Sequence, residues 1–302
     1  MRIVSFNMQY SLGADGRYDL ARSLRAVADA DIICLQEVDR HWRRSGMADQ
    51  PALIGAALPD RYWVYGCQFD TDASTANGQG QVINRRRQIG QMTVSRWPIV
   101  ASRTHIFPKL DSGDRLNHVT GALETVIATP RGPLRIFNIH LSDVAAVERM
   151  LQIGHLMTLL RNTPDEGPIR NGTEGDGEHW ESAAPPPPMP HLALLLGDFN
   201  AEPTSSEYVQ LLRGTQVPGS LTNLQRPCHH GFVDAWVASG NDPLKGITYR
   251  MNPDQGAYWD QRLDYCFLPE PMAGCLRNAW IDAETDASDH QPVWIELSGL
   301  PS

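Results

Sequence analysis

Residues 194–200 read Leu-Leu-Leu-Gly-Asp-Phe-Asn, and this stretch decides how the rest of the chain is interpreted. The apolar run Leu192–Leu196 predicts a buried strand, and Gly197 permits a sharp turn at which Asp198 leaves the core. We expect Asp198 and Asn200 to point to the same side, because alternate residues of an extended chain share a face. Such a pair can accept a proton from water and donate to an anion. The competing interpretation is a turn that uses both side chains only for local hydrogen bonds.

Three other apolar runs end in the same way, with a polar side chain directly after a predicted strand. These side chains are Asn7 after Ile3–Phe6, Glu37 at the end of the strand that begins at Ile32, and His140 after the run 134–139. Polar groups at the carboxyl ends of buried strands converge on one crevice in layered α/β folds. Carboxylates, amides and imidazoles gathered there suit a divalent cation and a phosphate ester. For Glu37 alone, an exposed loop acid is the alternative.

Two further acids lie close to the carboxyl terminus. Asp264 falls inside the predicted strand 262–268, where an unpaired buried carboxylate would be costly. His290 is the expected partner, and a structural salt bridge with Arg262 is the alternative. Asp289 and His290 precede the predicted last strand, 293–297, so they lie at its amino end.

Length and charge limit the kind of protein. The chain has 302 residues, a net charge of −9 and 41% hydrophobic residues, as expected for a globular protein. Because the polar signatures extend from Asn7 to His290, we expect a single domain over residues 1–302. A protein that binds nucleic-acid backbones usually carries a basic face, so the acidic surplus argues against tight duplex binding.

The amino terminus and the cysteines predict a cytoplasmic protein. Met1 and Arg2 lead directly into a strand pattern without a secretory signal, and we expect no transmembrane segment. Five cysteines without a CxxC pair indicate reduced thiols.

The strand and loop pattern predicts an α+β fold of two packed, mostly antiparallel sheets with helices outside. Residues 70–84 are rich in Gly, Asn, Gln, Asp and Thr, and predict a mobile surface loop. Residues 163–190 are polar and end in four prolines, which predicts a flexible surface insert.

The order of the signatures resembles the endonuclease/exonuclease/phosphatase superfamily, and in particular a small bacterial member of unassigned substrate. The resemblance covers nearly the whole chain and implies the deoxyribonuclease I-like fold, a four-layer α/β sandwich. It departs from the family pattern at Thr120, where members often carry a basic residue ahead of Gly121-Ala122-Leu123. The quoted signatures are Asn7, Gln36-Glu37, Asn138-x-His140, Gly197-Asp198-x-Asn200, Arg262-x-Asp264-Tyr265 and Ser288-Asp289-His290.

The same resemblance implies a role for each signature residue. Glu37 would bind Mg²⁺, or Mn²⁺ as a second possibility, with help from Asn7 and Asp289. Asn7 would either contact a ligand oxygen or orient Glu37 from behind. The remaining residues would act on the phosphoryl group: Asp198 and Asn200 on the attacking water and the phosphate, Asp264 and His290 as a hydrogen-bonded pair, and His140 on the phosphate or leaving group.

Four more residues are candidates for substrate binding: Trp42, Arg44, Arg86 and Trp259. Three of them have an alternative interpretation, namely packing for the two tryptophans and a solvated charge run for Arg86.

The sequence therefore predicts a Mg²⁺-dependent phosphodiesterase or phosphatase. The acidic composition favours a small-molecule or lipid-head-group substrate. A DNA or RNA endonuclease or exonuclease is the alternative. A non-catalytic binding module is disfavoured because the whole polar set is intact. The oligomeric state is left open.

Overall fold

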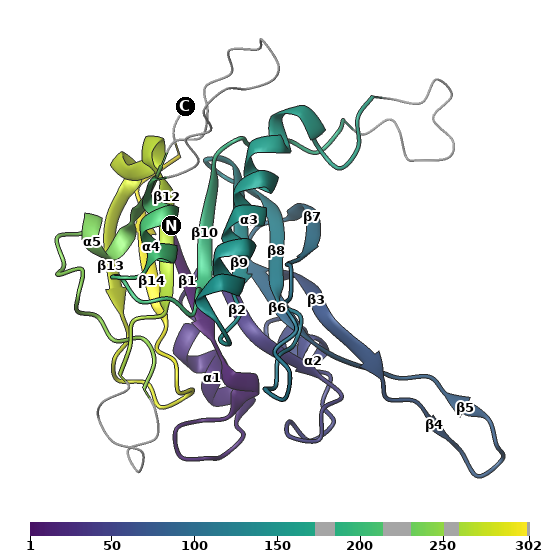
Figure 1. Ribbon diagram of the computed structural model, residues 1–302. Coiled ribbons are helices and arrows are strands. Elements are labelled where there is room, and N and C mark those ends of the chain that lie inside the picture. The colour runs from purple at the N-terminus through teal and green to yellow at the C-terminus, as the bar shows by residue number, and fades with distance from the viewer. Residues whose placement is uncertain (173–184, 214–230, 251–259, 301–302) are drawn as a thin grey trace.

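A computed structural model describes residues 1–172, 185–213, 231–250 and 260–300. Two six-stranded sheets pack face to face, and helices cover their outer faces (Figure 1). The expected four-layer sandwich of mostly antiparallel strands is confirmed.

The first sheet contains both ends of the chain. Its order is β13 (Leu276–Ile281), β14 (Val293–Leu297), β1 (Arg2–Asn7), β2 (Ile32–Arg40), β6 (Arg86–Ser95) and β3 (Tyr62–Asp72). β1 pairs in parallel with β2 and antiparallel with β14. The last strand of the chain is therefore joined to the first.

The second sheet is built mainly from the middle of the chain. Its order is β11 (Phe232–Asp234), β12 (Asp264–Pro269), β10 (Ala193–Asp198), β9 (Gly132–His140), β8 (Gly121–Thr129) and β7 (Ile99–Ile106). β9 and β10 are parallel, and β12 runs antiparallel to β10. β7 was not expected from the sequence, because its charged and polar residues alternate along an exposed edge strand.

The helices bury their apolar sides against the outer face of one sheet or the other. α1 (Leu20–Val27) and α2 (Gln50–Ala57) share a buried cluster with β1 and β2, whereas α3 (Ala146–Glu166) and α4 (Ser206–Arg213) share one with β9 and β10. α5 (Ala235–Ala238) and the 3₁₀ helices η1 (Gln9–Ser11) and η4 (Glu270–Cys275) are short. Among the helices of the described residues, none is long and apolar enough to cross a lipid bilayer.

The space between the sheets is an apolar core that ends in polar side chains. Ile3 and Ile32 of the first sheet pack with Leu194 and Leu196 of the second, all fully buried. Alternate residues of a strand face the same side. The alternation that buries Leu194 and Leu196 therefore directs Asp198 to the same inner face, at the strand end.

Residues 70–84 form a β-hairpin arm, so the expected mobile loop is wrong. β3 continues to Asp72, β4 (Thr75–Ala76) pairs with β5 (Val82–Ile83), and β6 begins at Arg86. The arm projects well beyond both sheets (Figure 1). A turn closed by the Gly80 N–H donating to the Asn77 carbonyl explains why a stretch so rich in Gly and Asn is ordered.

The expected insert at residues 163–190 begins too early. α3 continues to Glu166 and ends at Gly167, whose φ of 66° places it in the left-handed region. The Gly167 N–H donates to the Thr163 carbonyl at 2.9 Å, which is a common way to end a helix. Residues 173–184 lie outside the described part of the chain.

Candidate active site

Three strands meet at one edge of the second sheet, and each contributes a site residue. Asp198 ends β10, and its register partners are His140 at the end of β9 and Asp264 at the start of β12. All three side chains lie on the inner face and are at least nine-tenths buried. The sheet register alone therefore places two acids and an imidazole side by side.

Asn7 joins this edge to the first sheet. It ends β1, and its amide Nδ2 donates to Asp198 Oδ2 and to Glu37 Oε1, both at 3.0 Å. Its amide oxygen accepts the Gln9 N–H at 3.1 Å. Of the two functions expected for Asn7, this arrangement favours orienting Glu37 over contacting a ligand oxygen, because Nδ2 already donates to Glu37 and Asp198.

Glu37 reaches the site through a distortion inside a strand, so the expected strand end at this residue is wrong. β2 continues to Arg40, but its pairing with β6 shifts between Leu35 and Val38, and Glu37 has a φ of 55°. Such irregularities turn a side chain to a new direction. A positive φ is strained in a non-glycine residue, and strain of this kind is common at functional sites.

A buried set of amides supports the site from below. Gln36 Nε2 donates to Asn138 Oδ1 at 2.7 Å, and Asn138 Nδ2 donates to the Leu35 carbonyl at 3.0 Å. These bonds connect the two sheets directly beneath Glu37 and His140. They explain why the amides of Gln36 and Asn138 belong to the signatures.

Asp264 and His290 form the expected pair. His290 Nδ1 lies 2.8 Å from Asp264 Oδ2, while His290 Nε2 lies 3.7 Å from Asp198 Oδ2. Burial opposes a charged imidazole, but Asp264 and Asp198 outweigh it and raise the pKa of His290 well above its usual value. The Asp264 carboxylate orients the imidazole, and Nε2 of the ring faces Asp198. Arg262, the alternative partner, instead bonds Asp234 at 2.7 Å.

Asp289 and Glu37 are the residues best suited to a divalent cation. Burial, opposed by His290 and reinforced by the charge of Glu37, raises the pKa of Asp289 to about 6. The charge of Glu37 is felt at Asp289, a cation held by both carboxylates would offset this repulsion, and hard cations such as Mg²⁺ prefer oxygen ligands. Gln9 Nε2 donates to Asp289 Oδ2 at 2.7 Å and fixes its orientation. The donor set therefore fits Mg²⁺ or Mn²⁺.

A second grouping could also suggest a metal. Asp198, Asp264 and His290 bring possible ligand atoms within 4.8 Å of one another. Nδ1 of His290 already bonds Asp264, however, whereas the carboxylates of Glu37 and Asp289 offer the oxygen ligands that hard cations prefer.

Asn200 and His140 flank Asp198. The Asn200 N–H donates to Asp198 Oδ1, and its side-chain Nδ2 donates to the Leu141 carbonyl, both at 2.9 Å. The chain turns at Asn200, where φ is 49°, so the expected extended arrangement of Asp198 and Asn200 is wrong. His140 Nε2 lies 3.6 Å from Asp198 Oδ2. Among the described residues, one amide hydrogen of Asn200 and the His140 ring have no hydrogen bond and are available to a ligand.

The other expected substrate contacts are less central. Arg44 makes two hydrogen bonds to Asp39, at 2.8 and 3.0 Å, and stacks on Tyr10 and Trp42. Trp42 packs against Phe69 and donates to the Gln88 carbonyl, in agreement with the packing alternative.

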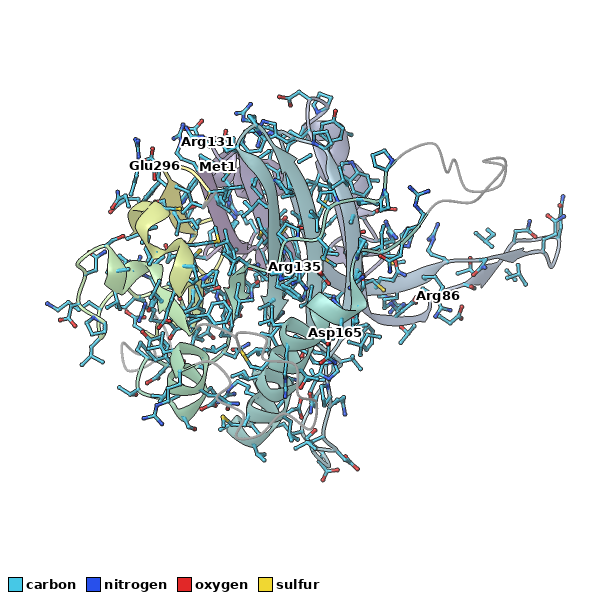
Figure 2. The ribbon with its side chains drawn as sticks, turned by 90° about the horizontal axis from the view of Figure 1, so that it is seen from above. Met1, Arg86, Arg131, Arg135, Asp165 and Glu296 are labelled. Carbon is cyan, nitrogen blue, oxygen red and sulfur yellow. The ribbon has the colours of Figure 1, made fainter. Side chains whose placement is uncertain are left out.

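Arg86 lies near the base of the projecting arm and bonds Asp70 at 2.7 Å (Figure 2). It therefore belongs to the arm rather than to the site. Trp259 lies outside the described residues.

The sequence interpretation missed three residues that contact the site. Gln9 holds Asp289, the Tyr249 ring lies 4.9 Å from that of His290, and Thr248 Oγ1 accepts the Asp264 N–H at 3.0 Å. Only Gln9 carried a signal, since it lies two residues after Asn7. The loop that carries Thr248 and Tyr249 is held by isolated bridges from Tyr249 to Gln261 and to His290.

Gly197 has a different function from the one expected. It lies inside β10 rather than at a turn, with a φ of 150°. A Cβ there would lie 1.9 Å from the Ile139 carbonyl oxygen. The glycine is needed because β9 and β10 approach each other closely beside the site.

The profile of the Endonuclease/Exonuclease/phosphatase family matches residues 4–290, and the chain belongs to this family. No curated protein matches the chain. The family and the fold agree with the resemblance seen in the signature residues.

Solved structures share the fold at low sequence identity. An endonuclease/exonuclease/phosphatase from Beutenbergia cavernae is 19% identical, with a TM-score of 0.61, and the match covers 100% of this chain and 72% of that one. A mannosyl-6-phosphatase from Bacteroides thetaiotaomicron is 14% identical, with a TM-score of 0.59 and coverage of 98% and 99%. A 3′ phosphatase from Neisseria, bound to a product DNA hairpin, is 17% identical, with a TM-score of 0.57 and the same coverage.

Proposed function

We propose that this chain is a Mg²⁺-dependent phosphoesterase that hydrolyses a phosphodiester or phosphomonoester by in-line attack of water. The observation that supports this proposal most is the set of groups that contact Asp198. Its carboxylate is held by Asn7 and by the Asn200 N–H, and it faces the Nε2 atoms of His140 and His290. An acceptor and two imidazoles thus face one small volume.

Each residue has a defined task in this reaction. Glu37 and Asp289 would hold Mg²⁺ or Mn²⁺, and such a cation supplies charge neutralisation for the phosphoryl oxygens. Asp198 orients the attacking water and accepts its proton. His290, protonated and fixed by Asp264, donates to the phosphoryl group. His140 and Asn200 donate to the phosphate or the leaving oxygen. Fixed donors aimed at developing charge are usually the largest contribution to catalysis.

The net charge of −9 supports a small-molecule or lipid-head-group ester over nucleic acid. Nuclease activity is the second candidate, because one structural neighbour is a 3′ phosphatase bound to DNA. The four cysteines of the described residues are free thiols, in keeping with a cytoplasmic protein.

A substrate panel tests the proposal. Purified protein is assayed with bis(p-nitrophenyl) phosphate, p-nitrophenyl phosphate and a DNA hairpin carrying a 3′ phosphate, each with Mg²⁺, with Mn²⁺ and with EDTA. We expect hydrolysis of one aryl ester that EDTA abolishes and Mg²⁺ restores. Cleavage of phosphodiester bonds within the hairpin, seen as shortened strands, would favour the nuclease. Absence of turnover in every arm would contradict the proposal.

His290→Ala and His191→Ala make a matched pair for the same assay. His290 lies in the site, whereas His191 is exposed and precedes β10. We expect the first variant to lose a factor of about a hundred or more in kcat and the second to retain wild-type activity.

A further inference from the structure

A small cavity adjoins the site on the side of the first sheet. Its volume is about 10 Å³, and Glu37, His140, Gln68, Gln91 and His118 contribute to its wall. A water-sized group needs roughly 10–15 Å³ of such volume. The cavity therefore accepts one oxygen-sized group, directly beside the residues that would hold the cation and the phosphate.

Gln68 is turned into this cavity by the local geometry of β3. The pairing of β3 with β6 shifts between Cys67 and Phe69, so that Gln68 is the extra residue of a bulge. Bulges commonly redirect a side chain next to an active site. The side chain lies over Gly121, where a Cβ would come within 2.7 Å of Gln68 Cγ. Gly121 is in turn the register partner of His140. The bulge and the glycine together seat the amide beside the imidazole.

The amide of Gln68 is buried without a partner inside the protein. Gln68 is 6% exposed, and within the described ranges neither its Nε2 nor its Oε1 finds a hydrogen bond. Gln91 is 2% exposed, and its Oε1 also has no hydrogen bond within the described ranges. Buried polar atoms are almost always hydrogen-bonded, and an unpaired amide in the interior is costly. Both side chains line the cavity, so their missing partner belongs in it.

The chemistry of these atoms indicates the partner. Two carbonyl oxygens and one NH₂ group can bond a hydroxyl, which both donates and accepts. A phosphate oxygen would meet two acceptors and the carboxylate of Glu37, and an apolar group would leave all three atoms unpaired. A hydroxyl oxygen also matches the volume.

We propose that Gln68, with Gln91, binds a hydroxyl group of the alcohol portion of the substrate. The substrate class is then a phosphate ester of a polyol or sugar. This inference rests on the phosphoesterase function proposed above and adds the residues that select the alcohol.

The test compares substrates that differ in hydroxyl groups. The monoester pair is a hexose 6-phosphate and phenyl phosphate, and the diester pair is glycerophosphocholine and bis(p-nitrophenyl) phosphate. Whichever pair wild-type protein hydrolyses is then measured with Gln68→Met and Gln91→Met, which keep the side-chain length and remove the amide. Gln210→Met is the control. Gln210 also has a buried, unpaired Oε1 within the described chain, but it lies on α4, away from the cavity.

We expect Gln68→Met to lower kcat/KM for the hydroxylated ester by about 10- to 100-fold, because the hydroxyl then loses its partner. We expect kcat/KM for the aryl ester to stay within about twofold of wild type, and Gln210→Met to change neither. An equal fall on both esters, no change on either, or wild-type turnover of the aryl ester alone would overturn the inference while leaving the phosphoesterase function standing. A wild-type protein inactive on all four esters would overturn the proposed function, and this inference with it.

Discussion

Asn7 controls the position of two carboxylates at once. Its single NH₂ group donates to Glu37 and to Asp198, and the residue is fully buried between the two sheets. Removal of that group leaves the buried Asp198 and the half-buried Glu37 without the donor that lies between them.

We therefore predict that Asn7→Ala lowers kcat by about 10- to 100-fold, because a buried hydrogen bond to a charged group typically contributes about 1.5–3 kcal/mol. Steady-state hydrolysis at saturating Mg²⁺ measures the effect. Asn77→Ala, which removes a half-exposed amide that bonds Gln81 on the arm, is the control and should match wild type. An Asn7→Ala enzyme of full activity would mean that Glu37 and Asp198 are positioned by other contacts.

Two buried aspartates have different functions: we expect Asp264 to support catalysis and Asp234 to support stability. Asp264 bonds His290 in the site, and Asp234 bonds Arg262 and Tyr208 away from it. Both are almost completely buried.

We predict that Asp264→Asn lowers kcat by a factor on the order of a hundred or more, because His290 loses the carboxylate that keeps it protonated and oriented. Asp234→Asn should instead lower the free energy of unfolding by about 3 kcal/mol with kcat retained, since it breaks a buried ion pair. Urea unfolding and kinetics on both variants check this. Loss of kcat in Asp234→Asn, with Asp264→Asn losing only stability, would contradict these roles of the two acids.

At the level of single residues, the sequence was informative where burial made a partner compulsory. The cost of burying Asp264 identified His290 as its partner. The sequence could not show that Glu37 lies at a strand irregularity, because a positive φ at this glutamate depends on how β2 pairs with β6. Nor could the sequence show that Thr248 and Tyr249 reach the site, because they lie in a loop held only by isolated bridges rather than at a strand end.

At the level of elements, the close approach of β9 and β10 holds the site edge together. Gly197 allows it, because any side chain would collide with the Ile139 carbonyl. Gly154 of α3 offers a contrast, as nothing lies within 4 Å of a Cβ placed there.

We predict that Gly197→Ala lowers the free energy of unfolding by about 3 kcal/mol or more, through overpacking against backbone. Gly154→Ala should raise it by about 0.5–1 kcal/mol, because alanine favours a helix interior. Urea denaturation of the two variants measures both shifts. A Gly197→Ala protein as stable as wild type would show that β10 can move away from β9.

The arm is a second element with a separable contribution. β4 and β5 are exposed, and no residue of the arm belongs to a buried cluster among the described residues. The sequence predicted a mobile surface loop here because a hairpin of mostly polar residues lacks the apolar alternation that marks a core strand.

We predict that joining Asp72 to Arg86 through Asn-Gly leaves the melting temperature within about 2 °C of wild type, because almost no buried apolar surface is lost. Activity on small esters should also be retained. Thermal unfolding followed by circular dichroism gives the first value, and a large drop would mean that the arm supports β3 and β6.

At the level of the whole molecule, chain ends complete one sheet. β1 pairs with β14, and the Met1 amino group donates to the Leu297 carbonyl at 3.0 Å. The site likewise draws on Asn7 and His290. The sequence predicted this architecture well, because the polar residues that follow the strands occur in a fixed order over the whole chain. It placed helix and insert boundaries poorly, because α3 ends at Gly167 through local backbone geometry rather than through a change in composition.

A single domain should unfold in one step. We predict coincident transitions by tryptophan fluorescence and far-ultraviolet circular dichroism in urea, because both sheets share the apolar core between them. Two separated transitions would indicate that the chain consists of two units.

The most direct test of the central claim is the hydrolysis rate of Asp198→Asn on the ester that wild-type protein turns over, with Mn²⁺ affinity measured in parallel by calorimetry. The substitution keeps the shape of the residue and removes the acceptor that faces the water and both imidazoles. The site described here predicts a fall in kcat of a factor of about a hundred or more, with Mn²⁺ still bound. Wild-type turnover by Asp198→Asn would show that the reaction takes place elsewhere or by other groups.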